Sequence, residues 1–159
     1  MPQFGNKSLS ILMTCDLDIQ NVMRRAIVHG PDFAVISGRR TTAEQAEKVR
    51  LGYSKTMNSK HVADPPHLAK AVDIGPYIAE YKQVIVGTDA QVAELAKLHG
   101  ISKQAVLARI WKQYGLCAGW ILKTAQEYGV QLRWGGDWDR DWNSINNNFE
   151  DLGHFELLT

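Results

Sequence analysis

Residues 71–77, Ala-Val-Asp-Ile-Gly-Pro-Tyr, decide the fold. Their side chains alternate, so Val72 and Ile74 fall on one face of an extended strand and Asp73 falls on the other. The apolar face needs a covering layer, whereas the carboxylate on the opposite face is left free for chemistry. We therefore expect a strand that is buried on one side and carries a polar group on the other.

The last residues of the chain repeat this pattern. In residues 154–158, His-Phe-Glu-Leu-Leu, His154 and Glu156 share one face and Phe155 and Leu157 share the other. The stretches 33–37 and 132–134 are also typical of short strands.

Four other segments have the apolar spacing of helices. The first covers residues 17–30, and we expect Gly30 to end it in a left-handed cap. The second begins at Thr41, which has the spacing of a capping box to Glu44, and stops near Gly52. The others cover residues 89–99 and 103–128, and residues 53–66 form a loop. Helices packed on one side of a small antiparallel sheet would make an α+β fold.

Length and composition indicate a single domain over residues 1–159, with 45% apolar and 22% charged residues. The net charge of +1 does not provide the positive field that attracts nucleic acid. The first residues resemble neither a signal peptide nor a membrane span, so we expect synthesis in the cytoplasm without stable membrane association. Cys15 and Cys117 form either one disulfide or two buried thiols, and thiols are the commoner state in the cytosol.

Histidines beside carboxylates form the candidate site. A catalytic zinc ion needs three protein ligands, which are imidazoles or carboxylates, and one open position for water. His61, Asp73 and His154 would supply this set. Their spacing alone is weak evidence, because a lone histidine is more often a surface residue or a satisfied core residue.

Several separated motifs occur in a fixed order along the chain. They are Ser-Gly-Arg-Arg-Thr at 37–41, Ser-Lys-His at 59–61 followed by residues 71–77, Leu-Arg-Trp-Gly-Gly-Asp-Trp at 132–138, and Asp-Leu-Gly-His-Phe-Glu at 151–156. Together they resemble the zinc peptidases of the D-alanyl-D-alanine carboxypeptidase and VanX/VanY type (M15 type), which share a Hedgehog/DD-peptidase-like fold. Within that group the likeness is to phage endolysins that are L-alanyl-D-glutamate peptidases, and it runs from Phe33 to Leu157.

The resemblance implies that His61, Asp73 and His154 bind one zinc ion and that Asp151 is the general base. A carboxylate near a zinc-activated water accepts its proton and passes it to the leaving amine. Asp151 precedes His154 by three residues in a turn that contains glycine, so it reaches the water without being a ligand.

The resemblance further implies that Arg40, Ser59 and Trp134 contact the substrate. Arg40 is a permanent cation that suits either a substrate carboxylate or the developing oxyanion. For Trp138 and Trp142, both a place in the substrate groove and ordinary packing stay open.

One spacing departs from the family pattern, in which six residues separate the first histidine from the aspartate. Eleven residues lie between His61 and Asp73, and five lie between His67 and Asp73. We expect His61 to be the ligand because Ser59 and Lys60 complete its motif, with the residues after it looped out. His67 is the alternative ligand, and otherwise it is an exposed loop residue.

Two secondary features have open interpretations. From Asp139, acidic or amide residues occupy positions 1, 3, 5 and 12 of a calcium loop, but Ser144 and Asn146 stand where glycine and an apolar residue are usual. Either Ca²⁺ binds here or the stretch is a polar surface loop. Glu156 either supports a zinc ligand or is an exposed strand residue.

The expected function is that of a phage endolysin, a monomer that hydrolyses the L-alanyl-D-glutamate bond of the peptidoglycan stem peptide. Such an enzyme reaches the wall through a separate membrane pore and lyses the host. The alternatives are a carboxypeptidase or dipeptidase that acts on terminal D-alanine, and a zinc-stabilised wall-binding module without catalysis.

Overall fold

The computed structural model describes residues 2–143, 145 and 150–159. Its helices are α1 (Asn6–Leu12), α2 (Leu17–His29), α3 (Thr42–Arg50), α4 (Asp89–His99) and α5 (Lys103–Glu127). Its strands are β1 (Phe33–Ser37), β2 (Ala71–Ile78), β3 (Gln83–Val84), β4 (Leu132–Trp134) and β5 (His154–Leu157). The four predicted helices and the four predicted strands are present, which confirms the α+β class.

The strands form an antiparallel sheet in the order β1-β2-β5-β4, and β3 pairs with β2 outside this path. Asp73 on β2 lies directly opposite His154 on β5 in the strand register. Residues that are directly opposite in an antiparallel pair project from the same face. The register therefore brings together two of the three predicted metal ligands.

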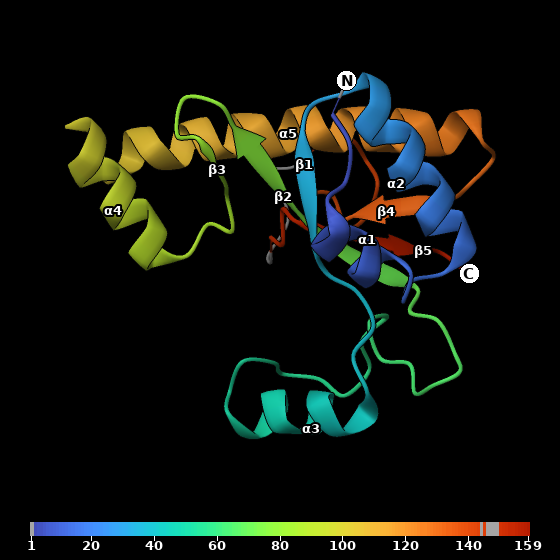
Figure 1. The fold of residues 1–159 in the computed structure, drawn as a ribbon. Helices are drawn as coiled ribbons and strands as arrows, with labels where there is room; N and C mark the ends of the chain where they lie inside the picture. Colours follow the sequence, from blue (N-terminus) through green and yellow to red (C-terminus); the bar gives the residue numbers. More distant parts are fainter. Residues whose placement is uncertain (1, 144, 146–149) are drawn as a thin grey trace.

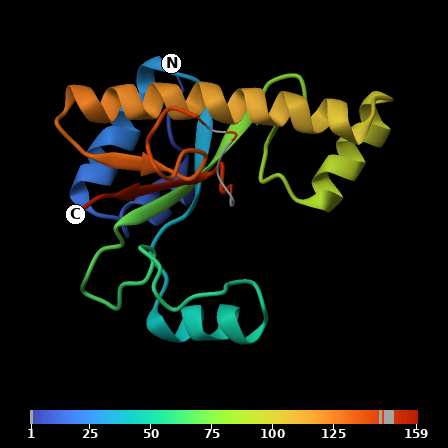
Figure 2. The same cartoon turned by 180° about the vertical axis from the view of Figure 1, so that it is seen from behind.

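Helices cover the other face of the sheet, as predicted. Val72, Ile74 and Phe155 have no exposed surface, and they join a core with side chains of α2 and α5. The long helix α5 runs along the whole molecule, whereas α3 lies apart from the other helices, beyond the opposite side of the sheet (Figures 1 and 2). A second apolar cluster joins α4 to the first half of α5.

The capping prediction for α3 is confirmed. Thr41 Oγ1 accepts a hydrogen bond from the Glu44 N–H, and the Glu44 carboxylate accepts one from the Thr41 N–H. This box satisfies two backbone donors that a helix start leaves without partners. It fixes the direction in which the chain enters α3 directly after Arg40.

Two short elements were not predicted. Helix α1 has seven residues and no side-chain cap, so it lacks the signals that mark longer helices. It is stabilised by tertiary contact, since Ser8 Oγ accepts a hydrogen bond from the Val35 N–H of β1. Strand β3 has only two residues, which is too short for an alternating pattern.

The predicted left-handed cap at Gly30 is wrong. Gly30 has φ −111° and ψ −165°, which is extended backbone. A Cβ on this residue would lie 2.1 Å from the Trp120 ring. The position therefore needs glycine because α5 packs against it, and local backbone conformation is not the reason.

Cys15 and Cys117 are both free and fully buried, which supports the thiol alternative. Burial raises the pKa of each thiol to about 12, so neither is a thiolate near neutral pH. Among the described helices, none combines the length and the hydropathy that a membrane span requires.

Candidate active site

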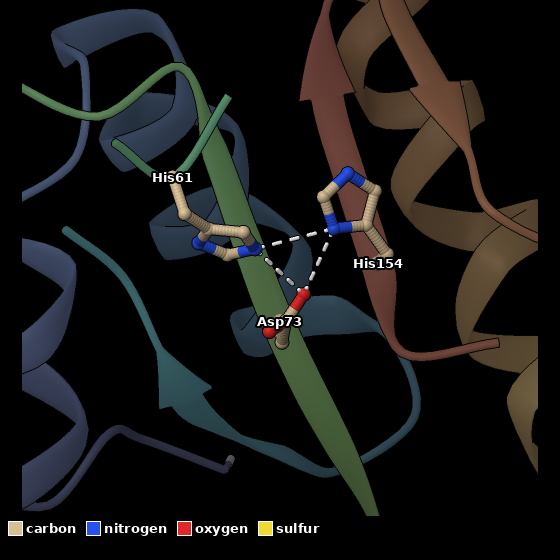
Figure 3. A group of neighbouring side chains, drawn as sticks. All are labelled: His61, Asp73 and His154. Atoms are coloured by element: carbon tan, nitrogen blue, oxygen red, sulfur yellow. Dashed lines mark hydrogen bonds and ion pairs between the residues drawn. The ribbon is translucent and has the colours of Figure 1, made fainter. Parts of the chain in front are cut away.

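Three side chains converge on the polar face of the sheet (Figure 3). Asp73 Oδ1 lies 3.0 Å from His61 Nε2 and 3.0 Å from His154 Nδ1, and the two nitrogens are 3.2 Å apart. His61 is 3% exposed and His154 is 6% exposed. These three atoms form a group that could hold a metal ion.

The donor set fits zinc. Two imidazole nitrogens and one carboxylate oxygen match the ligand types of catalytic zinc sites. Ligands of a tetrahedral ion with bonds of about 2.0–2.1 Å are separated by about 3.3 Å, close to the 3.0–3.2 Å found here. Without an ion, His61 Nε2 and His154 Nδ1 would both depend on one oxygen, Asp73 Oδ1, as their partner.

Backbone contacts explain how His61 reaches Asp73 despite the long spacing. The Lys70 N–H donates to the Lys60 carbonyl at 2.8 Å, which closes the base of the intervening loop. His61 Nδ1 donates to the Gly38 carbonyl at 2.7 Å. Since a carbonyl only accepts, this bond places the proton on Nδ1 and leaves Nε2 as the ligand atom.

His67 lies in the part of this loop that projects into solvent. It is exposed and does not line the pocket, and its carbonyl accepts a hydrogen bond from Arg39. The residues between His61 and Asp73 form a projecting loop, as expected if His61 is the metal ligand.

Glu156 holds the other imidazole. Its Oε2 accepts a hydrogen bond from His154 Nε2 at 3.0 Å, and its Oε1 accepts one from Arg133. Glu156 is only 6% exposed, so the alternative of an exposed strand residue is wrong. A carboxylate on one ring nitrogen orients the other nitrogen toward a metal.

These contacts shift the ionisation of the group. Although burial opposes its charge, the contacts with His154 and His61 hold the pKa of Asp73 below its usual range. Burial also disfavours a charged imidazole, but hydrogen bonds to Asp73 and Glu156 raise the pKa of His154 to about 9. In the metal-free protein a proton on His154 Nδ1 therefore bridges this nitrogen and Asp73 Oδ1.

Asp151 lies beside the three ligands, in the turn before β5. Its N–H donates to the Gly135 carbonyl at 2.9 Å, and its carbonyl accepts from the His154 N–H at 3.0 Å. A Cβ on Gly135 would lie 2.3 Å from the Asp151 carbonyl oxygen. The backbone of Asp151 is therefore fixed by a close approach that only glycine permits.

The ionisation of the Asp151 carboxyl suits proton transfer. The residue is exposed, yet its place at the pocket partly desolvates the carboxyl, and this together with repulsion from Asp73 raises its pKa despite the nearby His154 and His61. A carboxylate with a raised pKa is a better proton acceptor than an ordinary one.

A pocket of about 710 Å³ surrounds these groups. Ser59, Arg40, Asp151 and the three predicted ligands are among its lining residues. Trp138 also lines it, with its ring centroid 5.5 Å from that of His154. The pocket thus contains the predicted site residues with one exception, Trp134.

Trp134 is placed differently from the prediction. It packs against the core, and its Nε1 donates to the Leu152 carbonyl at 2.8 Å. It does not line the pocket, whereas Trp138 does. Trp142 is 85% exposed. Of the three tryptophans, Trp138 is the one that lines the pocket.

The sequence did not single out several residues that shape the pocket. The lining includes Lys48, Lys55 and Arg133. The buried Gln45 of α3 holds the lining residues Arg40, Ser54 and Thr56 by hydrogen bonds. Single lysines on a helix or in a loop carry no local pattern that separates a pocket wall from ordinary surface. A glutamine at a position where α3 needs an apolar residue is the one signal that could have been noticed.

The predicted calcium stretch is only partly described. Asp139 and Asp141 lie with Asp137 close enough to share one cation. Ser144 and Asn146 lie outside the described residues. Calcium binding therefore stays a prediction.

Comparison with known proteins gives a consistent result. A family model described as phage L-alanyl-D-glutamate peptidase matches residues 1–85, which include Arg40, Ser59, His61 and Asp73. The L-alanyl-D-glutamate peptidase of Escherichia phage T5 is 29% identical over 98% of this chain and 98% of its own length. The structure is similar to the L-Ala D-Glu endopeptidase ChiX of Serratia marcescens, with a TM-score of 0.66 and 26% identity over 98% of this chain and 89% of that one. Since the matched segment exceeds half of its length, the chain belongs to the phage L-alanyl-D-glutamate peptidase family.

Proposed function

We propose that this protein is a zinc-dependent endopeptidase that hydrolyses the bond between L-alanine and D-glutamate in the peptidoglycan stem peptide. The observation that carries the proposal is the convergence of His61 Nε2, Asp73 Oδ1 and His154 Nδ1 in the pocket, with Asp151 beside them. Membership in the peptidase family supports the same reaction.

His61, Asp73 and His154 would hold one zinc ion. When bound, zinc supplies a Lewis acid for the scissile carbonyl and lowers the pKa of water at its open position toward neutrality. The contacts to Gly38 and Glu156 keep both imidazoles in the orientation that ligation needs.

Asp151 is the general base in this proposal. Its carboxylate accepts a proton from the attacking water and then donates it to the nitrogen of the leaving D-glutamyl residue. The raised pKa of Asp151 in the metal-free protein makes its carboxylate a better proton acceptor than an ordinary one. The contact with Gly135 fixes the backbone of Asp151 relative to His154.

Arg40, Ser59 and Trp138 would contact the substrate. All three line the pocket. Trp138 offers an apolar surface next to the metal ligands, whereas Arg40 and Ser59 offer polar groups. In this proposal Trp138 contacts the substrate, which is the role that the family resemblance implied for Trp134.

The biological setting is part of the proposal. We propose a monomeric phage endolysin, with residues 1–159 as one peptidase domain, that is made in the host cytoplasm, reaches the wall through a separate membrane pore and lyses the host. The absence of a strong net charge disfavours nucleic acid as a partner.

Mass spectrometry of digested peptidoglycan tests the reaction. The expected products carry a new N-terminal D-glutamate, and Asp151→Ala should abolish their formation while the zinc content stays the same. Release of D-alanine alone would instead identify a carboxypeptidase. Zinc and wall binding without any product from the parent protein would identify a non-catalytic module.

A further inference from the structure

One side of the pocket carries cations without carboxylates. Arg40 precedes α3, Lys48 lies in its last turn, and Lys55 lies in the loop that follows; all three line the pocket, and we call them the cationic wall. The carboxylates of the lining are Asp73, Asp151 and Glu156, which lie on the sheet or in the turn before β5. On the sheet side Arg133 also lines the pocket, but it is paired with Glu156, so the cations without a carboxylate partner gather on the α3 side.

The acidic residues of α3 form no ion pair with the two lysines of this wall. Glu47 pairs with Arg50 at 2.6 Å, and Glu44 is engaged in the capping box with Thr41. Neither glutamate lines the pocket. Within the described part of the chain, no ion pair joins Lys48 or Lys55 to a carboxylate. By contrast, Lys60 also lines the pocket, but its Nζ donates to the Thr159 carbonyl oxygen.

A buried glutamine holds the cationic wall in place through hydrogen bonds. Gln45 has no exposed surface. Its Oε1 accepts a hydrogen bond from Arg40 Nη1 at 2.6 Å. Its Nε2 donates to Ser54 Oγ at 2.9 Å and to the Thr56 carbonyl at 2.5 Å. Lys55 stands between the two residues that Gln45 holds, so one side chain fixes the guanidinium and the backbone around Lys55.

We propose that the cationic wall binds the free α-carboxylate of the D-glutamyl residue at the scissile bond, which makes the protein selective for stem peptides in which this carboxyl is not amidated. The inference rests on the proposed function. A D-glutamyl residue acylated by L-alanine carries its α-carboxyl group on the same carbon as the leaving nitrogen. An anion therefore stands next to the bond to be cut, and a permanently charged guanidinium with two nearby ammonium groups is a matched partner.

The position of Arg40 in the cationic wall bears on its two possible roles, binding a substrate carboxylate or stabilising the developing oxyanion. The guanidinium is tied by Gln45 to the α3 side of the pocket, together with the lysines. The ligands Asp73 and His154 lie on the sheet, whereas Arg40 is joined to the third ligand, His61, only through its backbone N–H in the described structure. In this account Arg40 binds the carboxylate, because its guanidinium is held by Gln45 and lines the pocket together with the two lysines.

A pair of matched peptides tests the inference with the zinc-loaded full chain. The peptides are identical stem peptides with either an α-carboxylate or an α-carboxamide on D-glutamate. The carboxylate peptide should have the higher kcat/KM, by about tenfold to hundredfold, as expected for loss of a hydrogen-bonded charge. In the double variant Lys48→Gln/Lys55→Gln, KM for the carboxylate peptide should rise about threefold to tenfold with kcat unchanged, since binding alone is weakened.

Lys97→Gln/Lys112→Gln is the matched control. It removes the same charge from two exposed lysines, on α4 and α5, that do not line the pocket. It should leave KM unchanged, and a rise equal to that of the wall variant would overturn the inference. Equal cleavage of the two peptides by the parent protein would also overturn it while leaving the proposed function intact. Cleavage of neither peptide would contradict the proposed function, and this inference with it.

Discussion

Glu156 accepts a hydrogen bond from His154 Nε2 at 3.0 Å, and this contact leaves His154 Nδ1 as the nitrogen that faces Asp73. Both residues are buried on β5, two positions apart on one face. Arg133 donates to the other oxygen of Glu156 and so fixes the carboxylate in turn. The orientation of a predicted metal ligand is therefore set by a chain of contacts along β4 and β5.

Removing the charge of Glu156 should weaken metal binding. In Glu156→Gln one oxygen is lost, so the side chain no longer satisfies His154 and Arg133 together, and zinc affinity should fall by about 10- to 100-fold. Competition with a chromophoric chelator measures this. Glu80→Gln is the control, because Glu80 pairs with Arg109 at the surface. Equal affinities for Glu156→Gln and the control would show that Glu156 does not support the ligand.

The pKa of His154 predicts how zinc affinity depends on pH. Hydrogen bonds to Asp73 and Glu156 outweigh burial and raise this pKa to about 9 in the metal-free protein. Zinc needs the unprotonated Nδ1, so below this pKa each ion must displace a proton. Apparent affinity should therefore rise with pH by up to about tenfold per unit and level off above about pH 9. Chelator competition over this range checks it, and an affinity independent of pH would contradict it.

Gly135 should be needed for catalysis more than for metal binding. In Gly135→Ala the new Cβ would lie 2.3 Å from the Asp151 carbonyl oxygen, so the turn must shift. A displacement of about 1 Å at a catalytic group costs about 100-fold in rate. We expect kcat to fall by this order, with a smaller loss of zinc affinity.

Gly115→Ala is the control for the preceding variant, because nothing lies within 4 Å of a Cβ at this site in α5. It should keep full activity and stabilise the protein by about 0.5–1 kcal/mol, as an alanine does in a helix. If both glycine variants retain the parent kcat, the close approach to Asp151 has no catalytic role.

Gln45 should affect both stability and substrate binding. Gln45→Met preserves the volume but leaves Arg40, Ser54 and Thr56 without their buried partner, so the free energy of unfolding should fall by about 1–3 kcal/mol. KM should rise because the Arg40 guanidinium is no longer held. Ser102→Ala removes the N-cap of α5, away from the pocket lining, and should cost about 0.5–2 kcal/mol without a change in KM. Denaturant unfolding and steady-state kinetics separate the two effects, and an unchanged KM in Gln45→Met would count against a positioning role.

Much of the fold could be predicted because its signals are local. Alternation at residues 71–77 and 154–158 identified both the core face and the polar face of the sheet, and the capping box at Thr41 marked the start of α3. Helix α1 and strand β3 were missed because they are held by tertiary contacts. Gly30 was misinterpreted for the same reason, since the Trp120 ring that requires glycine is distant in sequence.

The candidate site also combines residues that the sequence could predict with contacts that it could not. His61, Asp73 and His154 belong to motifs that resemblance could locate, and the structure brings them together. The contact of Trp138 with the pocket and the role of Gln45 depend on the path of loops, which no periodicity records. The Lys60 to Lys70 hydrogen bond that accommodates the long spacing before Asp73 is likewise a property of the folded chain alone.

Zinc content and stem-peptide cleavage, measured in parallel for His61→Ala and His67→Ala, test the central claim most directly. His61→Ala removes an atom that lies 3.0 Å from Asp73 Oδ1, so both zinc and cleavage should be lost. His67→Ala changes an exposed loop residue outside the pocket and should retain both. Loss of zinc and activity in His67→Ala, with both retained in His61→Ala, would contradict the account.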